Sequence, residues 1–226
     1  MSRKQQAYDF LKKAIIANAI PAGEPVREMD IAKELAMSRT PIREAMRELE
    51  TEGVLTSYPS RGTFVVPLTP SDVEEIYELR ALHELWAIER SYDRITGDEL
   101  DFVEKAFEAS YRAMNWETWH QTDRLLHRLI LEKSGSRRVI TFVNTLNTQM
   151  DRIRGVSAAC DISRFEVSYR EHKEIIKRIR ERNLPQCKEA LRSHLRSVAN
   201  SAIESSKNIY VDLDLAMLRQ PAVGTE

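Results

Sequence analysis

The chain has 226 residues, of which 31% are charged and 42% are hydrophobic, with a formal net charge of −1. This is the balance of a soluble globular protein long enough for two domains, and it argues against a general polyanion binder. No apolar run is long enough for a signal peptide or a membrane span, so we expect a cytoplasmic protein without a membrane partner. Two cysteines, Cys160 and Cys187, are too few for a disulfide framework, and we expect reduced thiols.

The first third of the chain predicts a helix-turn-helix followed by a β-hairpin. Residues 5–20 carry apolar side chains at helical spacing, and the stretch PAGEPV ends that helix. Two shorter helices are expected, at about 29–36 and 40–52, joined by the turn MSRT. Ser38 is a candidate N-cap for the second of them, and Gly53 is suited to its end. The runs VLTSYP and TFVVP on either side of SRG then predict a hairpin.

From residue 69 onward the pattern is helical only. Six helices are expected, at about 70–93, 97–112, 116–134, 137–160, 163–182 and 185–207. Capping signals mark three of their starts, at Thr69, at Thr96 with Glu99, and at Ser163 with Glu166. We therefore predict a mainly α fold. It has an N-terminal winged helix-turn-helix over residues 1–68 and an all-helical C-terminal bundle over residues 69–226.

Arginines recur every four residues in the second short helix, as Arg39, Arg43 and Arg47. Four residues are a little more than one turn, so the three side chains lie along one side of the helix. In a winged helix-turn-helix this helix enters the major groove, where arginine reaches phosphates and guanine edges. Arg39 and Arg43 lie at the end that meets the bases, and Arg61 lies at the hairpin tip. The alternative is a solvated face with ion pairs to glutamates of the same helix, which stays open for Arg47.

The segment SRTPIREA…LETEGVL…RGTFV resembles the DNA-binding domain of the GntR family of bacterial transcription regulators, over roughly residues 5–66. The resemblance implies binding to double-stranded operator DNA. It implies contacts from the recognition helix and from the wing, by Arg39, Thr40, Arg43, Arg61 and Gly62. Many members carry an arginine after the glutamate of the first helix of the motif, whereas this chain has Met29.

The helical region contains a carboxylate and histidines at spacings that permit a metal site. Asp123 and His127 are four residues apart on one helix face. His172 and His194 lie on the last two helices, each about 16 Å from the intervening turn at about 1.5 Å per residue. If those helices fold back on each other, the two histidines can face each other. Spacing alone leaves open the alternative that they are core histidines without a metal.

Residues 70–207 resemble the effector domain of the FadR subfamily of GntR regulators, through YELRALHE, DRLLH, REHKEII and RSHL in that order. The resemblance implies that four residues coordinate a divalent metal ion: Asp123, His127, His172 and His194. Nitrogen and oxygen ligands without a thiolate suit zinc, nickel, manganese or iron. The resemblance also places Arg80 where it can bind the carboxylate of a small effector, although a salt bridge to Glu84, one turn on, explains it equally well.

These observations favour a ligand-responsive transcription regulator that is not an enzyme, and we expect it to be a repressor. It is expected to act as a homodimer on a two-fold operator, with a small organic acid bound at the metal in the helical domain. Two alternatives remain at this stage. One is a metal sensor with the ion as the effector, and the other is a metalloenzyme, because two histidines and a carboxylate also form oxygenase-type sites.

Overall fold

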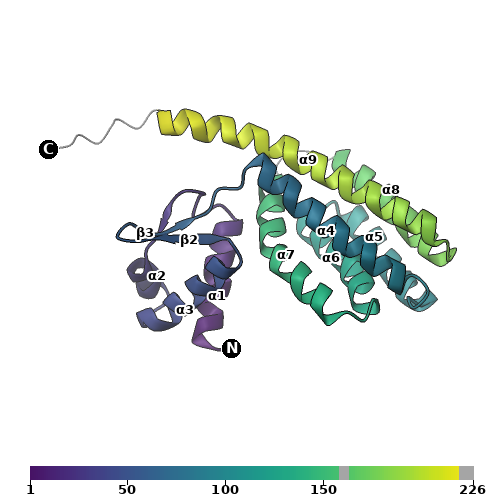
Figure 1. Ribbon diagram of the computed structural model, residues 1–226, viewed down its shortest axis with the longest axis horizontal. Coiled ribbons are helices and arrows are strands. Elements are labelled where there is room, and N and C mark those ends of the chain that lie inside the picture. Colours follow the sequence, from purple (N-terminus) through teal and green to yellow (C-terminus); the bar gives the residue numbers. More distant parts are fainter. Residues whose placement is uncertain (158–162, 219–226) are drawn as a thin grey trace. The chain divides into compact units, whose positions relative to one another are not determined.

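The computed structural model describes residues 1–157 and 163–218, which divide into two compact units (Figure 1). The first unit holds Met1–Val73, together with Thr145–Ser157 and the end of the last helix from Ser206. The second unit holds Glu74–Asn144 and most of the last two helices. The division predicted after residue 68 stays a prediction, since the first unit also takes residues from later helices.

Three helices build the N-terminal part of the first unit: α1 (Arg3–Ile16), α2 (Glu28–Glu34) and α3 (Arg39–Thr51). Their apolar faces form one core with members between residues 7 and 65, in which Leu11, Ile42 and Leu49 are fully buried. Helix α3 ends as predicted, because Gly53 has φ +68°, a conformation that glycine adopts without strain. Ser38 is the N-cap residue of α3, but its side chain makes no capping hydrogen bond.

A small antiparallel sheet completes this unit, with strand order β1-β3-β2. The predicted hairpin is β2 (Leu55–Tyr58) paired with β3 (Gly62–Val65). Strand β1 (Pro25–Val26) pairs with the other edge of β3 and was not predicted. Two residues are too short to show the alternation that identifies a strand, so its partner alone defines it.

The second unit is helical throughout its described residues. Its helices are α4 (Pro70–Ser91), α5 (Gly97–Ala113), α6 (Trp116–Lys133), α7 (Arg137–Ser157), α8 (Ser163–Arg180) and α9 (Leu184–Leu218). The beginning of α4 and the ends of α7 and α9 belong to the first unit. The predicted fold class is confirmed. The Thr96 and Glu99 capping box is present at the start of α5. The last helix extends to residue 218, beyond the expected 207.

A second hydrophobic core holds this unit together, with Phe107, Leu126, Ile175 and Leu191 fully or almost fully buried. The free thiol of Cys187 is buried in the same core, as expected, while Cys160 lies outside the described residues. Among the described helices, none combines the length and the apolar character that a membrane crossing requires.

Candidate metal centre and candidate DNA-reading face

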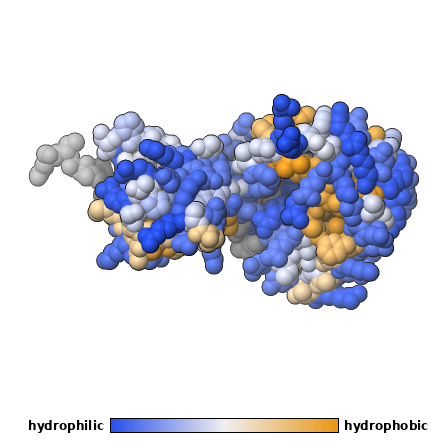
Figure 2. All heavy atoms as spheres, turned by 90° about the horizontal axis from the view of Figure 1, so that it is seen from below, coloured by the Kyte–Doolittle hydropathy of each residue, from blue (hydrophilic) through white to orange (hydrophobic). Residues whose placement is uncertain are grey.

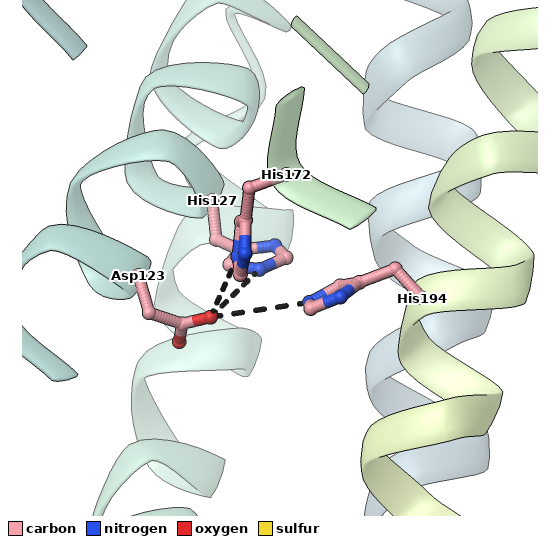
Figure 3. A group of neighbouring side chains, drawn as sticks. All are labelled: Asp123, His127, His172 and His194. Carbon is pink, nitrogen blue, oxygen red and sulfur yellow. Dashed lines mark hydrogen bonds and ion pairs between the residues drawn. The ribbon is translucent and has the colours of Figure 1, made fainter. Parts of the chain in front are cut away.

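Four side chains from three helices of the second unit meet in its interior (Figure 3). Asp123 and His127 lie one turn apart on α6, His172 comes from α8 and His194 from α9. All four are buried, and His172 and His194 are completely inaccessible. Each offers one ligand atom, and these atoms lie within 4.8 Å of one another. The structure therefore brings together the four residues that the sequence proposed.

The three imidazoles converge on a single carboxylate oxygen, Oδ1 of Asp123 (Figure 3). The Nε2 atoms of His172, His127 and His194 lie 3.0, 3.4 and 3.9 Å from it. The same nitrogen thus faces the centre in every ring.

The other ring nitrogen, Nδ1, contacts an acceptor in each case. His127 Nδ1 lies 2.5 Å from Glu84 Oε2, and His194 Nδ1 lies 2.9 Å from Glu171 Oε2. His172 Nδ1 lies 2.6 Å from the backbone oxygen of Ser168. Carboxylate and carbonyl oxygens only accept, so in His127 and His194, whose Nε2 atoms make no hydrogen bond, these contacts place the proton on Nδ1 and leave the lone pair on Nε2. In His172 an acceptor faces each nitrogen, because Nε2 also lies 3.0 Å from Asp123 Oδ1.

The residues fit a bound cation. The Nε2 atoms of His127 and His194 are buried and make no hydrogen bond in the described structure, although a buried polar atom normally has a partner. Metal–ligand bonds of about 2.0–2.2 Å place ligand atoms within about 4 Å of each other, so small side-chain movements would close the four ligands on one ion. The set of three imidazoles and a carboxylate is suited to zinc and other first-row divalent metals.

The histidines differ in their affinity for protons. Burial acts to lower the pKa of His127, but the carboxylates of Glu84 and Asp123 together outweigh it and the pKa is raised. Burial and the neighbouring His172 lower the pKa of His194 to about 3, so this ring is neutral near pH 7. A neutral imidazole is the form that binds a metal ion.

Arg80 on α4 lies next to this centre and is 2% exposed. Its Nε donates to Glu84 Oε1 at 2.6 Å, so the internal salt bridge considered from the sequence is present. Burial acts to raise the pKa of Glu84, but the positive charges of Arg80 and His127 outweigh it and lower the pKa to about 2. Arg80 Nη1 is buried and makes no hydrogen bond in the described structure. The salt bridge therefore does not use all the donors of this guanidinium.

Two further histidines and two arginines of the helical region are not part of this ligand set. His83 Nδ1 lies 2.6 Å from the Leu79 backbone oxygen, and its ring stacks on Phe142. His120 stacks on Trp116. Arg152 and Arg154 on α7 are buried, so they do not belong to an exposed face.

The candidate DNA-reading face lies in the first unit. Arg39, Thr40 and Arg43 lie in the first two turns of α3, and all three are exposed. Arg61 is exposed in the turn between β2 and β3, and Gly62 follows it with φ +101°. A solvated face would join these arginines to glutamates of the same helix, and the ion pairs in the structure are different. Arg39 and Arg43 both pair with Glu28 at the start of α2, and among the described residues neither forms an ion pair with a glutamate of α3.

Sequence reasoning missed the carboxylates that hold these cations and rings. Glu84 was considered only as a partner of Arg80, and neither Glu171 nor Glu28 was singled out. Glu84 is 43 residues from His127, and Glu171 is 23 residues from His194. The only local signal for Glu171 was its position directly before His172 in REHK.

Comparison with known families shows two matches that together cover most of the chain. The family model described as "Bacterial regulatory proteins, gntR family" matches residues 3–65, and the one described as "FCD domain" matches residues 75–197. The chain is 31% identical over 208 residues to the "Uncharacterized HTH-type transcriptional regulator YdhC" of Bacillus subtilis (strain 168), covering 90% of this chain and 91% of YdhC.

Two further proteins are informative. The "HTH-type transcriptional repressor RspR" of Escherichia coli (strain K12) is 24% identical, with 87% of each chain covered. Among solved structures, the Zn²⁺-bound FCD domain of TM0439 is 28% identical with a TM-score of 0.50, and the alignment covers 64% of this chain and 99% of that domain. Its metal-free form, 27% identical, aligns over the same shares with a TM-score of 0.55.

Proposed function

Because this chain belongs to the GntR family of bacterial regulatory proteins and carries an FCD domain, we propose that it is a repressor controlled by a small carboxylate bound at a metal centre. Its class, a DNA-binding transcriptional regulator, follows from the family. The proposal adds which residues bind the metal, the chemical class of the effector, the homodimer, and repression as the direction of regulation. Repression is supported by the similarity to RspR, which is named a transcriptional repressor.

The observation that carries the metal proposal is the common orientation of the three imidazoles. Each ring has Nδ1 occupied by an acceptor and Nε2 facing Asp123. Asp123, His127, His172 and His194 are the proposed ligands. Zinc is the proposed ion, because the FCD domain of TM0439 is described in a Zn²⁺-bound form. When bound, the ion would supply positive charge that attracts an anionic ligand.

Arg80 supports a carboxylate effector. Its Nη1 has N–H groups without a hydrogen bond, in a buried position where an unpaired charged donor is costly. Guanidinium binds carboxylate through parallel N–H donors. A pure metal sensor gives these donors no partner, and we therefore favour an organic acid over the ion alone as the effector. The named relatives are regulators, which supports a role other than catalysis.

A homodimer is supported by an apolar surface on the second unit. Leu82 and Trp86 on α4 are 65% and 37% exposed, and Phe142 on α7 is 38% exposed. His83 of α4 stacks on Phe142 of α7, with ring centroids 4.2 Å apart, so the two helices are adjacent at this point. Figure 2 shows hydrophobic residues reaching the surface of the helical body among hydrophilic ones. A second copy covering this surface would supply the second DNA-binding head that a two-fold operator requires.

The metal proposal is tested by elemental analysis of the tag-free protein after zinc has been added and the excess removed. We expect about one zinc per chain, and a large loss in His127→Ala and His194→Ala. His83→Ala is the matched control, because His83 lies on the same unit but outside the ligand set. Zinc affinity is expected to fall as the pH drops through the raised pKa of His127, since protons compete for its Nε2. Equal zinc content in all four proteins, or none in the wild type, would reject the centre.

The effector proposal is tested by measuring DNA binding of the zinc-loaded protein with a panel of small mono-, di- and tricarboxylates. At least one acid is expected to weaken DNA binding of the wild type and to leave Arg80→Lys unaffected, because lysine lacks the planar pair of donors. A response to zinc addition or removal alone, with no response to any acid, would favour the metal sensor instead.

A further inference from the structure

Glu28 lies between the two arginines that are proposed to read DNA. Its carboxylate accepts four hydrogen bonds, from Arg39 Nε at 3.2 Å and Nη2 at 2.9 Å, and from Arg43 Nε and Nη2 at 2.9 Å each. Glu28 is the first residue of α2, and the arginines lie on the first two turns of α3. One carboxylate of the neighbouring helix thus binds both guanidinium groups at once.

This arrangement adds little to the stability of the fold. The side chains of Arg39 and Arg43 are 58% and 50% exposed, and that of Glu28 is 22% exposed. Ion pairs in such surroundings are screened by water and salt and contribute little to folding. The hydrogen bonds from Arg43 nevertheless hold the pKa of Glu28 below its usual range, so its carboxylate is charged at neutral pH. We therefore expect the cluster of Glu28, Arg39 and Arg43 to act in DNA binding.

The geometry leaves a defined set of donors free on each arginine. A guanidinium has five N–H groups, and Glu28 takes the Nε side with one N–H of Nη2. The remaining edge, formed by Nη1 and the second N–H of Nη2, points away from the carboxylate. That edge is a fork of parallel donors, which matches the O6 and N7 acceptors of guanine in the major groove.

We propose that Glu28 is a positioning residue that raises the sequence specificity of this regulator. It acts in two ways. It fixes two flexible arginines so that their outer forks face the base edges, and its negative charge opposes attraction of the same arginines to phosphates of any sequence. Two guanidinium groups and one carboxylate carry a charge of +1, whereas the arginines alone carry +2. The inference rests on the proposed DNA contacts of Arg39 and Arg43.

Removing the charge should change specificity more than affinity. In Glu28→Gln the side-chain shape is retained, but each guanidinium is free to turn toward the backbone of any duplex. We expect tighter binding to random DNA and a steeper dependence on salt, by about 0.9 in log–log slope for each added phosphate contact. Discrimination between selected and random DNA should fall about tenfold or more, which is the contribution of one well-oriented arginine–guanine pair. Glu28→Asp keeps the charge and should retain part of the discrimination.

The experiment uses full-length protein and two duplexes, one selected by the wild type from a randomised pool and one with the same bases in scrambled order. Affinities for both are measured over a series of KCl concentrations. Glu34→Gln is the matched control, because Glu34 is an exposed residue at the other end of α2, and no hydrogen bond or ion pair joins it to Arg39 or Arg43 among the described residues. Thermal unfolding of each variant reports whether the fold is retained.

The outcomes separate this inference from the proposed function. A fall in discrimination in Glu28→Gln but not in Glu34→Gln supports the positioning role. Equal tightening on both duplexes overturns the positioning role, because Glu28 then only competes with DNA for the arginines. No change on either duplex also overturns it and makes Glu28 part of a surface ion pair without a role in binding. If the wild type enriches no sequence from the pool, DNA recognition itself fails. If Arg39→Ala and Arg43→Ala bind like the wild type, the proposed contacts fail.

Discussion

An imidazole binds a metal ion through one ring nitrogen, so the hydrogen bond of the other nitrogen decides which atom faces the ion. In this chain two of the three Nδ1 atoms contact glutamates that are in turn held by arginines. Glu84 is paired with Arg80 at 2.6 Å, and Glu171 with Arg164 at 3.3 Å. The first pair is almost completely buried and the second is about one-fifth exposed. Behind His127 and behind His194, a glutamate and then an arginine therefore follow the ring.

Neutralising these glutamates should weaken zinc binding without removing a ligand. Glu171→Gln is expected to lower zinc affinity about 10- to 100-fold, because the acceptor that orients His194 loses its negative charge. Glu84→Gln should lower it similarly and also destabilise the metal-free fold, by about 3–5 kcal/mol, since Arg80 would remain buried without its counter-charge. Zinc affinity is measured by chelator competition, and stability by denaturant unfolding.

Glu89→Gln provides the control for both variants. It removes the same charge from α4, where Glu89 makes an exposed ion pair with Lys188. Its zinc affinity should equal that of the wild type. If Glu171→Gln also retains wild-type zinc affinity while remaining folded, the glutamates do not orient the ligands.

Truncation of the recognition arginines should weaken DNA binding. We expect Arg43→Ala to cost about 1–3 kcal/mol on a selected duplex if it contacts a base edge, and Arg39→Ala to weaken binding as well. Arg47→Ala is the control, because Arg47 is exposed on the same side of α3 one turn further on. Fluorescence anisotropy with labelled duplex measures all three. Wild-type affinity in both Arg39→Ala and Arg43→Ala would show that α3 is not the reading helix.

At Met29, a substitution can add a positive charge to the candidate DNA-reading face instead of removing one. It is 68% exposed and follows Glu28, where many members of the family carry an arginine. Met29→Arg should strengthen binding to random DNA and steepen its salt dependence, because it adds one positive charge that can reach a phosphate. The same anisotropy titration, repeated at several KCl concentrations, measures the slope. An unchanged slope would place Met29 away from the DNA backbone.

At the scale of elements, the wing depends on backbone conformations that most residues avoid. In the turn between β2 and β3, Ser60 has φ +63° and Gly62 has φ +101°. A Cβ atom at Gly62 would meet no other atom within 4 Å, so space does not explain the glycine. The backbone conformation does, because L-residues are strained there.

Gly62→Ala is therefore expected to destabilise the protein by about 1–3 kcal/mol, through strain alone. Gly97→Ala is a matched control, because its added Cβ also meets no atom within 4 Å, but Gly97 is the first residue of α5 and has no positive φ. Alanine there should be neutral or stabilise by up to about 1 kcal/mol. Thermal unfolding compares the two. A Gly62→Ala protein as stable as the wild type would mean that the turn adopts another conformation at no cost.

At the scale of the whole molecule, the N-terminal helices and the helical unit have separate hydrophobic cores. The N-terminal core includes only residues between 7 and 65, and the helical core only residues of the second unit. Each core can therefore be perturbed separately. The apolar surface around Leu82, Trp86 and Phe142 belongs to the helical unit. A dimer formed through this surface would not use the proposed recognition helix α3 as its interface.

Placing a charge on that surface should separate the dimer. Leu82→Arg is expected to give a monomer at micromolar concentration and to weaken operator binding, because one head contacts only a half-site. Phe102→Arg is the control, since Phe102 on α5 has the same exposure of 65%. Sedimentation or light scattering reports the mass. A dimeric Leu82→Arg with a monomeric Phe102→Arg would move the interface to α5, and a monomeric wild type with full operator affinity would reject the dimer.

The sequence by itself determined the helices, the hairpin and their order. Helical periodicity and capping residues act within a few positions of each other, so the Thr96 and Glu99 box and the glycine after α3 were predictable from neighbours alone. The same holds for Asp123 and His127, which one helical turn places side by side. Strand β1 was missed, because two residues carry no periodicity of their own.

Only the tertiary structure decided which groups complete each site. The sequence indicates that Arg39 and Arg43 share a helix face, but not that Glu28 of another helix binds both of them. It indicates four candidate metal ligands, but not that Glu84 and Glu171 fix which nitrogen of His127 and His194 faces inward. These contacts join residues between 11 and 43 positions apart in the sequence. No local pattern specifies them, because the packing of separate helices sets the distances.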